Sequence, residues 1–107
     1  AEEAQTKAEA LKSEGNAALQ QGDHSTAVEK YTQAIALVGT NHIYYSNRCA
    51  AFVNLKKWEE AVADAKRTVE IAPDWAKGYM RLGASLDGLN NYEESQHAYR
   101  RVIELEP

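Results

Sequence analysis

A period of 34 residues is the feature of this sequence that most restricts its fold. Turn residues, apolar residues and small residues each recur at this interval. The sets are Gly39, Pro73 and Pro107; Leu11, Tyr45 and Tyr79; and Gly15, Cys49 and Gly83. Because repeats of this length are typical of stacked helix–turn–helix units, we expect an all-α solenoid in which each repeat packs on its neighbours.

The segments between the turns are predicted to be helices. They are rich in strong helix formers, and their apolar residues follow helical rather than alternating spacing. The expected breaks lie at 21–23, 39–41, 56–57, 72–74 and 90–91. They give six helices in three antiparallel pairs. Asp74 is an expected N-cap, and Asn91 with Glu94 resembles a capping box.

The period also sets the domain organisation. We assign one domain to residues 1–107, with repeats at 8–41, 42–75 and 76–107. A small residue stands at the twentieth position of each repeat, where two helices must approach closely. These residues are Ala27, Ala61 and Ser95.

Composition excludes several classes of protein. The chain has 107 residues, a net charge of −4 and one cysteine, Cys49, which cannot form an intramolecular disulfide. A reducing compartment is therefore favoured. No apolar stretch approaches the roughly 20 residues of a membrane span, and the acidic N-terminus is unlike a signal peptide. We therefore expect a cytoplasmic protein that does not bind membrane. No nucleic-acid partner is expected either, because a net negative chain binds nucleic acid poorly unless its cations cluster on one face.

No catalytic or metal-binding group is expected. Cys49 occupies a position that glycine fills in the other repeats, which indicates a packed thiol rather than a nucleophile. His24, His42 and His97 stand at different repeat positions and never at the i, i+4 spacing of a helical metal site. The interpretation is a binding module without a cofactor and not an enzyme.

A second stripe on the first helix of each repeat is predicted to line a concave groove. Positions two, five, six and nine lie on one helical face, apart from the packing positions. The stripe consists of Glu9, Lys12, Ser13 and Asn16; Ile43, Ser46, Asn47 and Ala50; and Lys77, Met80, Arg81 and Ala84. It is basic although the chain is acidic. Asparagine amides there can donate to an anion and keep an acceptor for a peptide N–H, so the groove suits an acidic peptide end.

Five residues of this stripe carry a resemblance to a known family. Lys12, Asn16, Asn47, Lys77 and Arg81 look like the carboxylate clamp of co-chaperone tetratricopeptide repeat (TPR) domains, in identity and in spacing. The resemblance covers essentially the whole chain and is greatest to the first TPR domain of the stress-inducible organising proteins (the Hop/Sti1 family). The small glutamine-rich TPR proteins are also similar.

The resemblance implies a ligand and a role for each residue. The ligand would be the C-terminal Glu-Glu-Val-Asp of cytosolic heat-shock chaperones of the seventy- and ninety-kilodalton classes. Lys12, Asn16, Asn47 and Lys77 would hold the two carboxylates of the terminal aspartate, with Arg81 acting further back along the peptide. Leu19 and Ala50 are the candidates for a valine pocket.

Two alternatives remain at this point. A clamp-type TPR also serves as the targeting domain of immunophilins and phosphatases, and other TPRs bind an internal or targeting peptide. The sequence also lacks the seventh helix that usually covers the last repeat. Apolar groups at Tyr99, Val102 and Ile103 would then face water, so we expect a fragment of a longer protein or self-association through the uncapped last helix.

Overall fold

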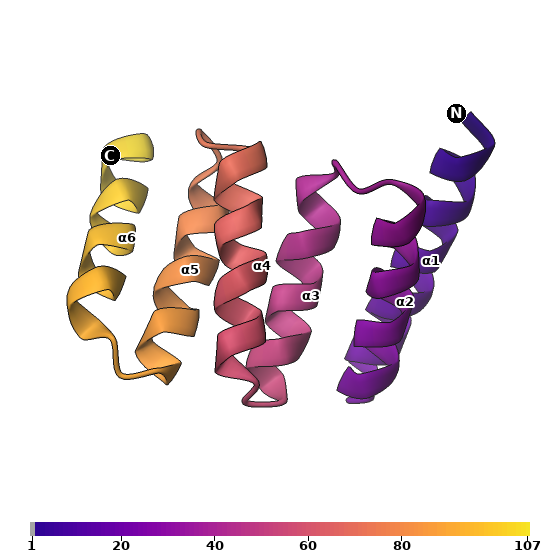
Figure 1. Cartoon of the computed structure of the whole chain (residues 1–107), viewed down its shortest axis with the longest axis horizontal. Coiled ribbons are helices and arrows are strands. Elements are labelled where there is room, and N and C mark those ends of the chain that lie inside the picture. Colours follow the sequence, from indigo (N-terminus) through magenta and orange to yellow (C-terminus); the bar gives the residue numbers. More distant parts are fainter. Residues whose placement is uncertain (1) are drawn as a thin grey trace.

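The computed structural model describes residues 2–107, which form six α-helices connected by short turns (Figure 1). The helices are α1 (Glu2–Gln20), α2 (His24–Leu37), α3 (His42–Asn54), α4 (Trp58–Ile71), α5 (Ala76–Gly88) and α6 (Tyr92–Leu105). Each helix packs on the next along the chain, and α3 also contacts α5. The stack extends 40 Å along its longest axis and 20 Å along its shortest. The all-α fold is therefore confirmed.

The turn inside each helix pair is the same structure three times. Gly22, Lys56 and Asn90 have φ values of 80°, 59° and 60°, in the left-handed region. The N–H that follows each of them bonds back to the fifth carbonyl before it, as in Asp23 N to Ala18 O at 2.9 Å. This is the Schellman arrangement, which satisfies the last carbonyls of a helix.

The helix beginnings differ from the prediction in their caps. Trp75, not Asp74, occupies the N-cap position of α5 and makes no side-chain cap bond. Asn91 does occupy the N-cap of α6, but its amide donates to the Glu94 carboxylate at 2.8 Å instead of accepting from the backbone. Asp23, by contrast, accepts from Thr26 N at 3.1 Å.

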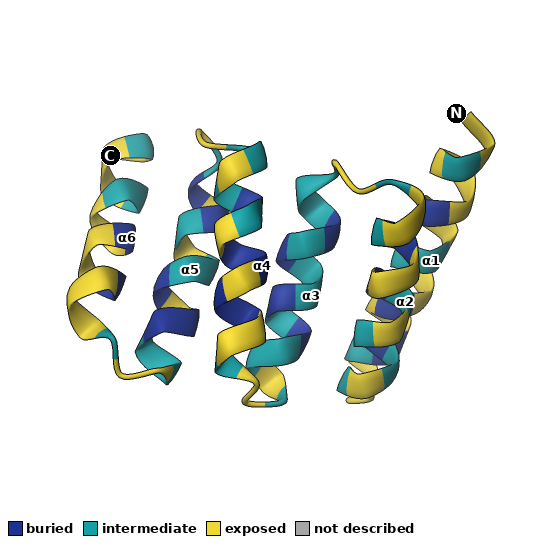
Figure 2. Cartoon of the chain, viewed as in Figure 1, coloured by how far each residue is buried: buried dark blue, intermediate teal, exposed yellow. Residues whose placement is uncertain are grey.

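The core of each helix pair depends on matched side-chain volumes. A Cβ added at Gly15 would lie 2.6 Å from the Tyr31 ring, and one at Gly83 would lie 2.6 Å from the Tyr99 ring. In the middle repeat the equivalent residues are Cys49 and Ala65, which pack together in one buried cluster. Figure 2 shows that such buried positions lie between the helices, while the outer faces are exposed. Burial raises the pKa of the Cys49 thiol, consistent with a packing role.

The end formed by α6 exposes two of the three apolar groups predicted to face water. Ile103 is 67% exposed and Tyr99 is 37% exposed, whereas Val102 is half-buried. The Tyr99 ring also packs over Gly83, and its hydroxyl donates to Asp87 at 3.1 Å. Self-association through this end stays a prediction. Among residues 2–107, none of the helices has the length and apolar character needed to cross a bilayer.

Candidate functional site

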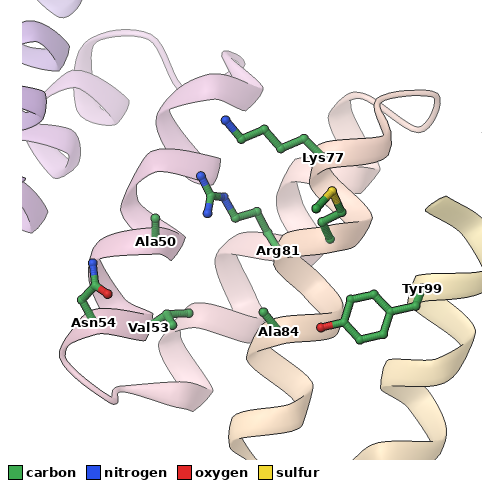
Figure 3. A pocket seen from close by; sticks show the side chains of 8 residues that line it. Ala50, Val53, Asn54, Lys77, Arg81, Ala84 and Tyr99 are labelled. Atoms are coloured by element: carbon green, nitrogen blue, oxygen red, sulfur yellow. The ribbon is translucent and has the colours of Figure 1, made fainter. Parts of the chain in front are cut away.

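The groove side of the stack contains a pocket of about 350 Å³ between α3, α5 and α6 (Figure 3). Its walls combine small and apolar side chains with two cations. Tyr99 from α6 closes one end. The lining residues are Ala50, Val53, Asn54, Lys77, Met80, Arg81, Ala84 and Tyr99.

Lys77 and Arg81 supply the positive charge of this pocket. Both side chains extend from α5 toward α3 (Figure 3). Arg81 Nε donates to Ser46 Oγ at 3.3 Å, which holds the guanidinium across the gap between the two helices. Within residues 2–107, no carboxylate lies within ion-pair distance of either cation. Two adjacent cations without a counter-ion favour the binding of an anion.

Asn16 on α1 is oriented from behind by a buried tyrosine. The Tyr31 hydroxyl donates to Asn16 Oδ1 at 2.5 Å. Because the carbonyl oxygen already accepts this bond, the amide presents its two N–H donors outward. This bond uses one of the two acceptor lone pairs of Oδ1, and the N–H donors suit a carboxylate. That Asn16 also accepts from a peptide N–H stays a prediction.

Lys12, one turn before Asn16, is bound to a neighbouring carboxylate. Its Nζ lies 2.9 Å from Glu9 Oε1, and the other oxygen of Glu9 accepts a bond from the Tyr44 hydroxyl at 2.5 Å. The hydrogen bond from Tyr44, followed by that from Lys12, lowers the pKa of the Glu9 carboxyl. Burial and the adjacent Glu9 raise the pKa of Tyr44 to about 12, so this hydroxyl remains a donor.

Asn47 lies half-buried on α3, and the residue after it anchors the helix. Arg48 donates from Nε and Nη2 to the two oxygens of Asp64 on α4, at 2.8 and 2.7 Å, and from Nη1 to Thr32 at 3.1 Å. Burial raises the pKa of Asp64, and the paired guanidinium opposes that rise. This bidentate pair links α3, on which Asn47 stands, to α4.

The two candidates for a valine pocket lie in different hollows. Leu19 lines an open depression of about 410 Å³ with Asn16 and Gln20, whereas Ala50 lines the pocket beside Lys77 and Arg81. Ala50, Lys77 and Arg81 therefore line one hollow, and Asn16 and Leu19 line another. It does not bring Leu19 and Ala50 into one pocket.

Two tyrosines make groove contacts that the residue pattern did not predict. The hydroxyls of Tyr31 and Tyr44 bond to Asn16 and Glu9 of the groove stripe. A sequence signal exists for Tyr31, which stands opposite Gly15 as Tyr99, two periods later, stands opposite Gly83. No comparable periodic signal marks Tyr44.

Comparison with known proteins identifies the fold family. The family profile described as "Tetratricopeptide repeat" matches residues 76–107. The structure titled "First TPR of Spaghetti (RPAP3) bound to HSP90 peptide SRMEEVD" superimposes with a TM-score of 0.94 and is 35% identical, over 96% of this chain and 82% of that one. The chain belongs to the tetratricopeptide repeat family. The resemblance stated from the clamp residues is confirmed at this level.

Two further TPR proteins are similar over nearly all of this TPR domain. The second TPR domain of human RPAP3, solved with the HSP70 peptide SGPTIEEVD, is 29% identical with a TM-score of 0.94, over 97% of this chain and 87% of that one. The Hsp70-Hsp90 organizing protein of Triticum aestivum is 44% identical over 94% of this chain. The chain spans 17% of that relative's length.

The groove stripe presents positive charge and hydrogen-bond donors. In the part of the chain that the structure describes, no group of three or more His, Cys, Asp or Glu side chains converges as metal ligands would. The polar groups of the groove include Lys77 and Arg81 without counter-ions, the Asn16 amide and the Glu9–Lys12 pair. Such an arrangement can hold carboxylates by charge-assisted hydrogen bonds.

Proposed function

We propose that this TPR domain is a co-chaperone adaptor module that binds the acidic C-terminal Glu-Glu-Val-Asp tail of heat-shock chaperones. The partners are the cytosolic chaperones of the seventy- and ninety-kilodalton classes, and the module acts in the cytoplasm without catalysing a reaction. The observation that carries the proposal is the pair Lys77 and Arg81, two cations without a counter-ion beside a pocket of about 350 Å³.

Each clamp residue has a chemical role in this proposal. The terminal aspartate brings two carboxylates, and the groove offers ammonium, guanidinium and amide donors to them. Arg81 acts further back along the peptide, and its planar fork suits a carboxylate. The residues that hold the terminal aspartate are Lys12, Asn16, Asn47 and Lys77.

Apolar contacts supplement the charges. Ala50, Val53, Met80 and Ala84 form an uncharged floor beside Lys77 and Arg81. An uncharged side chain of the peptide, such as its valine, buries apolar surface there while the carboxylates bind the cations. Leu19 provides a second apolar contact near Asn16.

Similar domains support the choice of ligand. The two RPAP3 TPR domains were solved with peptides that their titles give as SRMEEVD and SGPTIEEVD, both ending in EEVD. These ligands are properties of those proteins, and the same chemistry is proposed here because the five clamp residues are present.

The expected affinity follows from the number of contacts. Each charge-assisted hydrogen bond contributes roughly 1.5–3 kcal/mol, and ordering the peptide offsets much of this gain. Micromolar binding, about −8 kcal/mol, is the expected scale. Such binding is readily reversible, as an adaptor requires.

Calorimetric titration with a peptide ending in Glu-Glu-Val-Asp tests the proposal. We expect Lys77→Ala and Arg81→Ala each to weaken binding about 10- to 100-fold, because each removes a charge-assisted contact. Lys66→Ala, which removes an exposed cation from α4, is the matched control and leaves the affinity unchanged.

The C-terminal amide of the same peptide tests the terminal carboxylate. Weaker binding of the amide supports the clamp. Equal binding of acid and amide would reject it in favour of an internal or targeting peptide, and binding that survives both groove substitutions would do the same. Peptides from the two chaperone classes, titrated in parallel, measure the preference between them.

A further inference from the structure

The predicted groove stripe contains one carboxylate, Glu9, and both of its oxygens are engaged. Lys12 Nζ lies 2.9 Å from Oε1, and the Tyr44 hydroxyl donates to Oε2 at 2.5 Å. Tyr44 belongs to α3 and is buried, so the carboxylate is held from two helices. Glu9 therefore contacts Lys12, which is one of the five residues proposed to bind the ligand.

This contact differs from an ordinary surface pair. The Glu3–Lys7 pair on the same helix is separated by 3.5 Å, and its glutamate side chain is 84% exposed. In the groove pair, the Lys12 side chain is 26% exposed against 65% for Lys7, and the Glu9 side chain is 53% exposed. A third group, the Tyr44 hydroxyl, also holds the glutamate. Partial burial and a fixed geometry both reduce screening by water.

The position of Glu9 affects any anion that approaches Lys12. The ammonium group has three N–H donors, and one of them is directed at Glu9. A ligand carboxylate that binds Lys12 therefore lies beside the Glu9 carboxylate on the same ammonium group. The two negative charges repel each other. Lys77 and Arg81 have no such competitor in the described residues.

We propose that Glu9 is an internal competitor for Lys12, which occupies the ammonium in the free protein and limits the affinity of the groove for a peptide carboxylate. The inference rests on the proposed function, since it concerns the same ligand. Tyr44 is a positioning residue in this arrangement: its hydroxyl keeps the Glu9 carboxylate against Lys12. Glu9 thus keeps binding weak enough for exchange between partners.

Glu9→Gln tests the proposal with a close isostere. We expect the acid peptide to bind about fivefold more tightly, the size of an exposed ion-pair effect converted to affinity. The amidated peptide should change little, because it brings no terminal charge to Lys12, so the acid-to-amide ratio rises. Tyr44→Phe should raise the acid-to-amide ratio by a smaller amount. Glu9 still pairs with Lys12 in this variant, but it loses the hydrogen bond from the Tyr44 hydroxyl.

Glu14→Gln is the matched control. Glu14 lies on the same helix, pairs with Lys30 at 3.0 Å outside the groove, and has a side chain 54% exposed against 53% for Glu9. Both substitutions change the net charge equally, so only Glu9→Gln should raise the affinity for the acid peptide.

The same titrations separate this inference from the proposed function. If Lys77→Ala weakens binding but Glu9→Gln behaves like Glu14→Gln, the competitor role is overturned while the clamp stands. If Glu9→Gln weakens binding of the acid, Glu9 orients Lys12 instead, and the competitor role is again overturned. If wild type does not bind, or Lys77→Ala has no effect, the proposed function fails and the competitor role fails with it.

Discussion

Tyr31 and Tyr44 are buried tyrosines that act at the groove through their hydroxyl groups alone. Their rings belong to the core, and the hydroxyls end on Asn16 Oδ1 and Glu9 Oε2, both at 2.5 Å. Packing and polar function are therefore carried by different atoms of the same residue. Removing one oxygen atom separates the two roles experimentally.

The first prediction concerns Tyr31→Phe. The ring and the core remain, but the Asn16 amide loses the bond that directs its donors outward. We expect about fivefold weaker binding of an acidic peptide, the worth of one hydrogen bond, with little change in stability. Tyr45→Phe, which removes a hydroxyl bonded to Gly39 O at 2.9 Å outside the groove stripe, is the control. Equal effects of the two substitutions on titrated affinity would refute the orienting role.

The second prediction concerns the buried ion pair of Arg48 and Asp64. Arg48→Ala leaves a buried carboxylate without its partner, which we expect to lower the free energy of unfolding by about 3 kcal/mol at neutral pH. Arg67→Ala, which breaks an exposed pair with Glu70, should cost less than about 1 kcal/mol. Urea denaturation of both variants measures the difference.

The loss in Arg48→Ala should depend on pH. Burial raises the pKa of Asp64, so without Arg48 the folded state binds this proton more tightly than the unfolded state. The destabilisation is complete above the raised pKa and diminishes as the pH falls through it. A penalty that is constant from acid to neutral pH would show that desolvation of Asp64 is not its cause.

At the scale of the helices, the three turns of the helix pairs share one backbone conformation but not one residue type. Glycine is the residue that adopts it without strain, and asparagine tolerates it better than lysine does. Gly22 and Asn90 suit the position, whereas Lys56 with φ 59° does not. The 34-residue period predicts the turn at Lys56, although the residue itself does not favour one.

The third prediction is that Lys56→Gly stabilises the domain. It relieves the steric cost of a left-handed lysine, which we expect to raise the free energy of unfolding by about 1 kcal/mol. Asn90→Gly should raise the free energy of unfolding by less, because asparagine tolerates the left-handed conformation better than lysine does. Lys57→Gly, at the neighbouring residue with φ −92°, should not stabilise. A thermal melt in which Lys56→Gly and Lys57→Gly coincide would contradict the strain argument.

At the scale of the whole molecule, net charge misrepresents the groove. The chain carries −4, yet Lys12, Lys77 and Arg81 lie on the groove stripe and only Glu9 among the stripe residues opposes them. The local field that a ligand meets is therefore positive. The net charge averaged over the sequence therefore does not describe the surface that a ligand meets.

The fourth prediction follows from that field. Binding of the acidic peptide should weaken steadily as NaCl rises from about 50 to 500 mM, because the Debye length shortens from over 10 Å to a few ångströms. The amidated peptide, with one charge fewer, should show a shallower dependence. Affinity that is independent of salt would indicate that the apolar pocket, rather than the cations, carries the binding.

The sequence by itself determined the period, the six helices, their turns and the stripe that holds the candidate clamp. Each of these follows from local spacing, because residues three or four apart share a helical face whatever the helix packs against. That Leu19 and Ala50 contact the valine of a peptide stays a prediction. They line separate hollows, because spacing along a helix does not fix which hollow a side chain enters.

Only the tertiary structure decided how the groove residues are held. The Tyr31–Asn16 bond joins residues 15 apart in sequence, and the Tyr44–Glu9 bond joins residues 35 apart. Such bonds depend on the distance and the rotation between packed helices, and the side-chain volumes at Gly15 and Tyr31 help to set that distance. Hydrogen bonds require their atoms to meet within a few tenths of an ångström. A repeat period does not specify the distance or the rotation between helices to that precision.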